Sequence, residues 1–166
     1  MSLIVETGTG NVDSESYCSV ETADAYHSSI GNETEWCYLD TYVKEQLLRK
    51  ATLQMLQVYW CKWAGRRANE LQALDWPREC VYANGFAVST TLVPVPVQKA
   101  CAEYALRAKS GALAADIGQA VKREKIGVLE VEYADASTAE IKYPALDRMV
   151  EPYFKTRAGR IMLERA

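Results

Sequence analysis

The residues that could carry chemistry in this chain are few and scattered. His27 is the only histidine, so a Cys-His pair with Cys18 or Cys37 is the one nucleophilic arrangement left open, and nothing around these residues supports it. Glu130 and Glu132 fall on one face of a predicted strand, where two carboxylates could share acid and base roles. A solvated strand face flanked by Lys and Arg explains that pair better. We therefore expect a protein that is not an enzyme and has no catalytic residues.

Two further patterns argue against a bound cofactor or metal ion. Gly8-Thr9-Gly10 lacks the third glycine, the following helix and the lysine of a nucleotide-binding loop, so we interpret it as a turn. The five cysteines lie about twenty residues apart without a C-x-x-C pair, which is typical of reduced cysteines used as small apolar side chains. The sequence predicts neither a cofactor nor a metal ion.

Aromatic and basic residues near the middle of the chain could form a different kind of site. Tryptophans close to arginines can stack on the bases of single-stranded nucleic acid while the cations contact phosphate. The candidate DNA contacts under this hypothesis are Trp63, Arg66, Arg67, Trp76 and Arg78, with Trp60 nearby. The same tryptophans could instead fill a core that fixes the surrounding loop, and we favour this second interpretation.

Charge is distributed unevenly along the chain. The net charge is −3 and the pI is about 5.3, whereas a dedicated nucleic-acid binder more often has a dense basic patch. No Lys or Arg precedes Lys44, and that stretch holds eight acidic residues; the remainder has all 19 basic residues and 14 of the 22 acidic ones. Such a dipolar chain can pair head to tail with copies of itself, although an ordinary solvated surface explains the charges equally well.

The length and composition are typical of one folded domain. The chain has 166 residues, of which 49% are hydrophobic and 25% charged. No apolar run approaches the roughly 20 residues of a membrane helix, and the first residues lack a secretory signal. We expect no membrane contact and a cytoplasmic location, with a single domain over residues 1–155 and a basic, apolar tail over residues 156–166.

Hydrophobic spacing and capping residues predict four helices. Ser19 can cap a helix over Val20–Ser29 that ends at Gly31. A long helix follows, over about residues 40–62, capped by Asp40 or Thr41. Pro94 and Pro96 mark the start of the third helix and Pro144 the start of the fourth, in which Pro152 should introduce a kink. The predicted buried stripes are Ala23, Tyr26 and Ile30; Val43, Leu47, Leu48, Ala51, Met55, Val58, Tyr59 and Lys62; Val97, Cys101, Tyr104 and Ala108; and Leu146, Met149, Val150, Tyr153 and Phe154.

The segments between these helices are predicted to be loops and short strands. Residues 3–5 suggest a strand or an extended arm. Residues 65–93 suggest a long ordered loop anchored by Trp63 and Trp76. Alternating Leu129, Val131 and Tyr133 indicate a half-buried strand, whose antiparallel partner is either residues 122–126 or residues 139–143. The predicted fold is mainly α (α+β): a small helical bundle with a β-hairpin or small antiparallel sheet and extended terminal arms.

An ordered set of motifs covers nearly the whole chain and resembles a known phage family. The motifs are Leu3-Ile4-Val5-Glu6 with Gly8 and Gly10; Ser16-Tyr17 and Ser19; Ala23-Asp24-Ala25-Tyr26; Leu48 with Ala51-Thr52; Gly65-Arg66-Arg67; Gln72-Ala73-Leu74 with Trp76-Pro77-Arg78; Val93-Pro94 and Val97; Glu124-Lys125-Ile126-Gly127; Glu130-Val131-Glu132-Tyr133; and Tyr143-Pro144. In these motifs the chain resembles the family labelled DnaT-like single-stranded DNA-binding protein, which is similar in layout to the head-completion adaptors of tailed phages.

This resemblance implies a structural virion protein of the phage neck, present in the host cytoplasm during assembly. It implies a head-to-tail adaptor that forms a homo-oligomeric ring, usually of twelve copies, between the portal protein and a tail or tail-completion protein. Double-stranded DNA would pass through the ring without sequence-specific binding. We expect the ring to contact the portal through the tail, with Arg157, Arg160, Ile161, Met162, Leu163 and Arg165 as candidate contacts. The alternative function is a replication accessory protein that binds single-stranded DNA.

Overall fold

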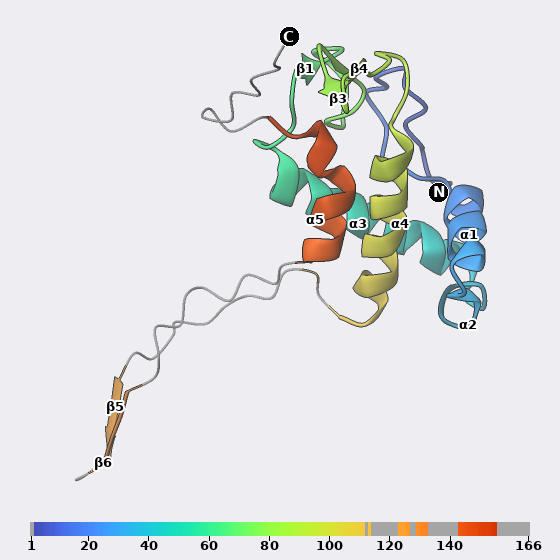
Figure 1. Ribbon diagram of the computed structural model, residues 1–166. Helices are drawn as coiled ribbons and strands as arrows, with labels where there is room; N and C mark the ends of the chain where they lie inside the picture. The colour runs from blue at the N-terminus through green and yellow to red at the C-terminus, as the bar shows by residue number, and fades with distance from the viewer. Residues whose placement is uncertain (1, 112, 114–122, 127–128, 133–142, 156–166) are drawn as a thin grey trace.

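The chain folds as a mainly α protein with small antiparallel β-sheets, as the sequence predicts. The computed structural model describes residues 2–111, 113, 123–126, 129–132 and 143–155 (Figure 1). The elements in chain order are α1 (Val20–Ser29), α2 (Glu33–Trp36), α3 (Thr41–Tyr59), β1 (Arg66–Arg67), β2 (Arg78–Glu79), β3 (Tyr82–Ala83), β4 (Phe86–Ala87), α4 (Val95–Lys109), β5 (Arg123–Ile126), β6 (Leu129–Glu132), α5 (Pro144–Val150) and the 3-10 helix η1 (Glu151–Tyr153).

Helix α3 is the longest element and runs through the middle of the fold. The Asp40 carboxylate accepts a hydrogen bond from Tyr42 N at 2.8 Å and caps its first turn, as predicted. The helix ends at Tyr59, earlier than the predicted residue 62. The predicted burial of Val43 and Lys62 is wrong: both side chains are exposed, and Lys44, adjacent to Val43, is buried. Lys44 can occupy the buried face because its ammonium group lies 2.9 Å from the Asp24 carboxylate.

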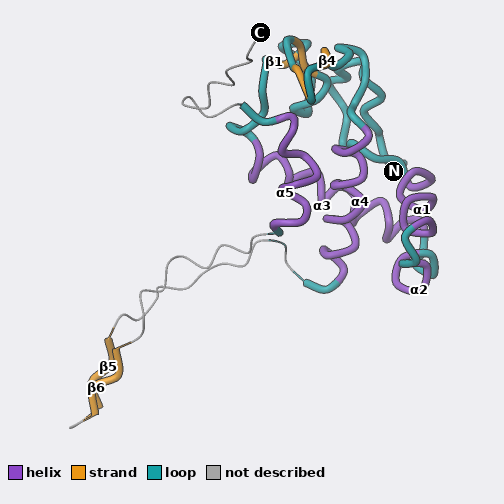
Figure 2. The backbone as a smooth tube through the Cα atoms, in the orientation of Figure 1, coloured by secondary structure: helices purple, strands orange, loops and turns teal. Residues whose placement is uncertain are grey.

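Helix α4 packs against α3 and carries most of the small buried residues. It begins after Pro94, as the proline pair predicts, and its fully buried positions include Ala100, Ala102 and Ala105. These side chains allow the backbones of neighbouring helices to approach closely. Figure 2 shows α4 and α5 side by side across α3, with α1 and α2 at the N-terminal end of α3. The contacts of α4 with α3 and with α5 bury one part of the hydrophobic core, and Trp63, Trp76 and Val81 from the segment between α3 and α4 complete it.

Helix α1 has the predicted bounds but a different buried face. The Ser19 hydroxyl accepts a hydrogen bond from Thr22 N at 3.1 Å, and Gly31 follows the helix with a φ of +82°. Ala23 and His27 are its buried residues, whereas Ile30 is exposed, so the prediction for Ile30 is wrong. The reason is that α1 presents the His27 side to α4, where the imidazole meets the Ala102 carbonyl.

The long segment between α3 and α4 contains more structure than the predicted loop. Strands β1 and β2 pair antiparallel, and so do β3 and β4. Asn84 and Gly85 connect β3 to β4 with φ values of +53° and +84°, the combination required by a two-residue type I′ turn. Sequence reasoning missed this hairpin, although an Asn-Gly pair is its strongest local signal. These strands lie together near the N-terminal end of α4 (Figure 1).

The remaining elements resolve one open alternative and modify two predictions. Strand β6 pairs with β5 in register Arg123↔Glu132, so the partner is the segment before it. Helix α5 stops at Val150 and continues as the 3-10 turn η1, which contains Pro152. Residues 3–5 form no regular strand and make one parallel bridge, Val5 to Ser16. The candidate portal contacts lie in residues 156–166, outside the described residues.

No helix in the described part of the chain combines the length and the apolar character needed to cross a membrane.

Candidate functional site

The two tryptophans proposed as DNA-stacking residues lie in the core. Trp63 is 1% exposed and Trp76 is 0% exposed. Their rings pack edge to face, and Phe154 and Tyr153 contact the outer sides of Trp63 and Trp76 respectively. Neither ring can stack on a base in this conformation. The interpretation of both tryptophans as core residues is therefore confirmed.

Arg78 is also committed to the interior. Its guanidinium donates hydrogen bonds to three backbone carbonyls, those of Ala64 at 2.7 Å, Gly65 at 3.0 Å and Asp75 at 3.1 Å. Burial lowers the pKa of the Arg78 guanidinium from its usual value, an effect that the nearby Asp75 partly opposes. Arg78 therefore joins the start of the loop to its middle, and its guanidinium is not available to a phosphate group.

Arg66 and Arg67 are the candidate DNA contacts that the structure leaves at the surface. Arg66 forms an ion pair with Glu79 across the β1–β2 pair at 2.8 Å, and the Arg67 Nη2 donates to the Leu74 carbonyl at 3.3 Å. Arg66 remains largely exposed despite its partner. Nearby in sequence, Trp60 is 73% exposed, which makes it the tryptophan of this region that could meet a partner molecule.

The β3–β4 hairpin presents two aromatic rings that the sequence analysis did not single out. Tyr82 and Phe86 are 69% and 77% exposed. They belong to adjacent strands, and the register pairs them with Ala87 and Ala83 respectively. Since cross-strand partners share a face, Tyr82 and Phe86 lie on opposite faces of the hairpin. The Asn84-Gly85 turn, together with two aromatic residues that alternate with alanines, is the signal that could have found them.

The glycine-containing turn near the N-terminus is an anion site that the chain itself fills. Backbone N–H groups of Gly8, Gly10 and Asn11 donate to the Glu6 carboxylate at 2.7, 3.0 and 2.9 Å, and the Ser14 hydroxyl donates at 3.0 Å. Burial by itself would raise the pKa of Glu6, but these hydrogen bonds outweigh it and lower the pKa. The loop is therefore a structural turn, as predicted, with a carboxylate in the place where a phosphate would bind.

The possible Cys-His pair is not assembled. His27 Nε2 faces the Ala102 carbonyl at 3.1 Å, and its Nδ1 has no hydrogen-bond partner within the described part of the chain. The Cys18 thiol donates to the Ser19 carbonyl, and burial raises the pKa of this thiol. Cys37 is exposed. Over the described ranges, no three His, Cys, Asp or Glu side chains gather as a metal site.

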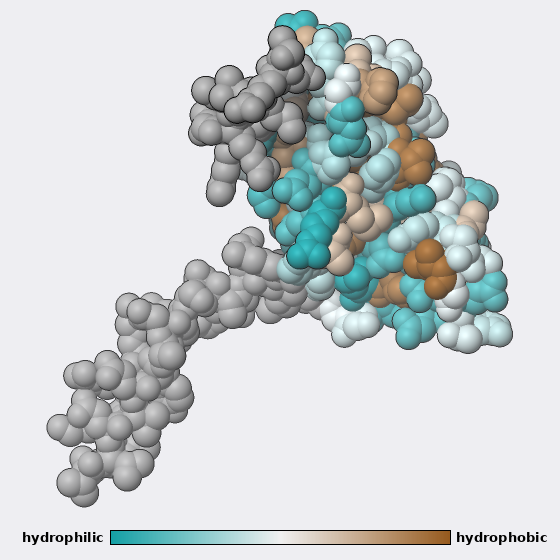
Figure 3. All heavy atoms as spheres, viewed as in Figure 1, coloured by the Kyte–Doolittle hydropathy of each residue, from teal (hydrophilic) through white to brown (hydrophobic). Residues whose placement is uncertain are grey.

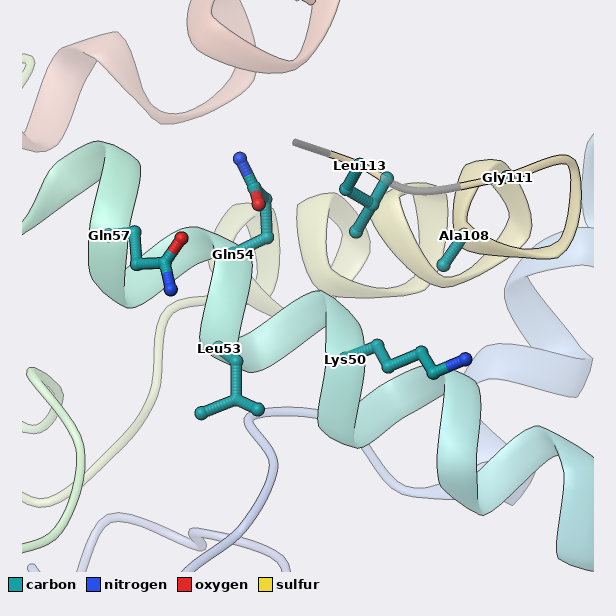
Figure 4. A pocket seen from close by; sticks show the side chains of 7 residues that line it. All are labelled: Lys50, Leu53, Gln54, Gln57, Ala108, Gly111 and Leu113. Atoms are coloured by element: carbon teal, nitrogen blue, oxygen red, sulfur yellow. The ribbon is translucent and has the colours of Figure 1, made fainter. Parts of the chain in front are cut away.

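A shallow cleft of about 490 Å³ lies between α3 and the end of α4 (Figure 4). Lys50, Leu53, Gln54 and Gln57 line it from α3, opposite Ala108, Gly111 and Leu113. Amide and aliphatic groups dominate these described walls, a composition suited to contact with another polypeptide segment. The Glu130 and Glu132 pair is elsewhere, on β6.

The fold and these surfaces define a small, mainly α protein that displays exposed aromatic rings beside charged side chains. Figure 3 shows apolar side chains interrupting the hydrophilic surface on the face drawn. A model of the family described as "Putative DnaT-like ssDNA binding protein" matches residues 1–166, and the chain belongs to this family. No curated protein and no solved structure matches the chain significantly.

Proposed function

We propose that this protein is a structural virion protein, a head-to-tail adaptor that assembles as a ring between the portal and the tail of a phage. The proposal rests on two groups of exposed aromatic residues, which lie at separate places on the surface of the protein. Tyr38 and Tyr42 lie near the junction of α2 and α3, and Tyr82 and Phe86 lie on the β3–β4 hairpin. Aromatic side chains are enriched at protein–protein interfaces because they bury large areas with few rotatable bonds.

The burial of the two tryptophans that were candidates for base stacking also supports the assembly function in preference to DNA binding. Trp63, Trp76 and Arg78 rigidify the body, and Glu6 occupies the one backbone anion site formed by the glycine turn. The inner surface of a ring through which DNA passes functions best without tight phosphate contacts, because such contacts would retain the genome. The acidic pI of about 5.3 is consistent with such a surface.

Electron microscopy of the purified protein mixed with portal rings tests the adaptor function. We expect a second ring stacked on the portal, and co-sedimentation of the two proteins, with each protein alone as the control. If the protein does not co-sediment with portal at any concentration tested, the adaptor function is wrong.

The second candidate function is binding of single-stranded DNA during replication. The family description favours it, and so does the exposure of Trp60 close in sequence to Lys62, Arg66 and Arg67. Base stacking on one exposed indole with nearby cations would give modest, salt-sensitive affinity. Titration of a labelled oligonucleotide with the protein and with a Trp60→Ala variant separates this function from the first.

A further inference from the structure

Two exposed surfaces of opposite charge lie at the two ends of helix α3. The first, which we call the acidic face, surrounds the α2–α3 junction and consists of Glu33, Glu35, Tyr38, Asp40 and Tyr42. All five side chains are exposed, and Tyr38 is 86% exposed. Lys109 of α4 lies at the edge of this face and donates a hydrogen bond to the Glu35 carbonyl at 2.7 Å, so the three carboxylates and this one ammonium leave a net charge of −2. Trp36 anchors this face to the core, because its side chain is fully buried and its indole N–H donates a hydrogen bond to the Asp24 carboxylate at 2.6 Å.

The second surface, the basic face, surrounds the C-terminal end of α3 and consists of Trp60, Lys62 and Lys155. All three are exposed, and the Lys62 ammonium lies 5.3 Å from the centre of the Tyr59 ring. Two distant parts of the chain meet here, because Lys155 N donates to the Lys62 carbonyl at 2.8 Å. An antiparallel bridge between Trp63 and Phe154 secures the same junction.

The separation of these faces determines what kind of contact they can make. From Tyr42 to Trp60 the helix advances about 27 Å at 1.5 Å per residue, so the two faces cannot meet within one molecule. Contact between two acidic faces, or two basic ones, would oppose like charges. Contact between the acidic face of one copy and the basic face of the next joins opposite charges and buries Tyr38 or Tyr42 against Trp60.

We propose that the acidic face of one copy of this chain docks on the basic face of the next copy. The partner is a second copy because the chain carries both complementary surfaces, each with exposed aromatic rings for the centre of a contact. An interface between unlike faces repeats from subunit to subunit, and it closes into a ring when the rotation is favourable. This inference rests on the proposed assembly function and names the surfaces that would build the ring.

Two native cysteines provide a direct test. Cys37 lies beside Tyr38 on the acidic face and Cys61 beside Trp60 on the basic face, and both are exposed. A short bismaleimide added to the concentrated protein should join Cys37 of one copy to Cys61 of the next. Because each chain carries both residues, the products should form a ladder beyond the dimer, and peptide mass spectrometry should identify the Cys37–Cys61 link.

Matched variants decide between unlike and like contacts. Cys37→Ser alone and Cys61→Ser alone should each lose the ladder, whereas a mixture of the two should give dimers and nothing larger. Cys80→Ser, which removes another exposed cysteine, should leave the ladder unchanged. Predominant Cys37–Cys37 or Cys61–Cys61 links, or no ladder, would overturn the proposal.

Charge exchange tests the pairing further. Lys62→Glu should reduce the ladder at least tenfold, and addition of Glu35→Lys in the same chain should restore it. A failure of the exchange to restore the ladder would also count against this pairing.

If an unlabelled single-stranded oligonucleotide protects Cys61 from the reagent and no ladder forms, the basic face binds nucleic acid instead. If the ladder forms but the protein does not co-sediment with portal rings, the result would support this interface between copies and contradict the adaptor function.

Discussion

Trp63 and Trp76 pack edge to face, with ring centroids 5.6 Å apart and an angle of 84° between their planes. Trp63 follows the end of α3, while Trp76 lies within the long segment that leads to α4. Phe154 and Tyr153 extend the same row of rings from the C-terminal side. The row therefore ties three separate parts of the chain together, and it explains why a segment with only two-residue strands is ordered.

Trp76→Ala should destabilise the protein severely. Removing a fully buried indole leaves a cavity and should lower the free energy of unfolding by about 3–5 kcal/mol. Urea denaturation followed by circular dichroism measures this loss. Trp60→Ala, at an exposed position, is the matched control and should change stability by about 0.5 kcal/mol or less. Equal effects of the two substitutions would contradict the assignment of Trp76 to the core.

Glu6→Gln should weaken the N-terminal turn. The carboxylate accepts four hydrogen bonds that the variant cannot match, so we expect a loss of about 1.5–3 kcal/mol at neutral pH. The folded state lowers the pKa of Glu6, so its contribution is present above the ordinary value of 4.5 and is lost as the pH falls through the folded pKa. Urea denaturation should show the gap between wild type and variant narrowing in that acidic range. Glu70→Gln is the exposed control.

His27 should make stability depend on pH just below neutrality. Burial lowers the pKa of His27 from its usual 6.5, although contact with the Ala102 carbonyl partly opposes this. In the unfolded chain the imidazole takes up a proton near pH 6.5, whereas the folded protein resists protonation. Stability should therefore fall as the pH drops below about 6.5. Thermal melts between about pH 7 and pH 5 should show a flatter profile for His27→Gln than for wild type; an equally steep profile would assign the dependence to other groups.

The purified protein should bind single-stranded DNA weakly. The buried positions of Trp63, Trp76 and Arg78 remove three of the five candidate contacts. Arg66 and Arg67, the two remaining candidates, attract phosphate groups electrostatically, and salt weakens this attraction. Filter binding at about 150 mM salt should therefore retain little oligonucleotide. A Kd below about 1 µM that is lost in the Arg66→Ala, Arg67→Ala double variant would support the replication function instead.

Deletion of residues 156–166 should leave the fold intact and abolish docking on the portal. Phe154 is the last residue of the buried stripe predicted for the final helix, and its ring packs against Tyr59 and Trp63. The deleted tail combines Arg157, Arg160 and Arg165 with apolar neighbours, which suits a partner surface with acidic and apolar patches. Circular dichroism tests the fold and co-sedimentation with portal rings tests docking. A truncated protein that melts normally and still co-sediments would place the portal contact elsewhere.

Local signals in the sequence were sufficient to predict most helix boundaries. Ser19 and Asp40 cap their helices through hydrogen bonds within three residues, and the prolines at 94 and 144 mark helix starts because of their own fixed φ. The Asn84-Gly85 turn was equally predictable, since its two positive φ values are local properties. All these features depend on interactions within a few residues, which a single sequence contains.

Only the tertiary structure decided which side chains are buried and which are free to act. Trp60 and Trp63 are identical residues three positions apart, yet one is exposed and the other is enclosed by Trp76 and Phe154. The sequence likewise could not show that Lys44 is buried in place of Val43, because that exchange requires Asp24 from another helix. Burial depends on contacts between segments far apart in the chain, and their free energies exceed the local preferences that a sequence pattern reveals.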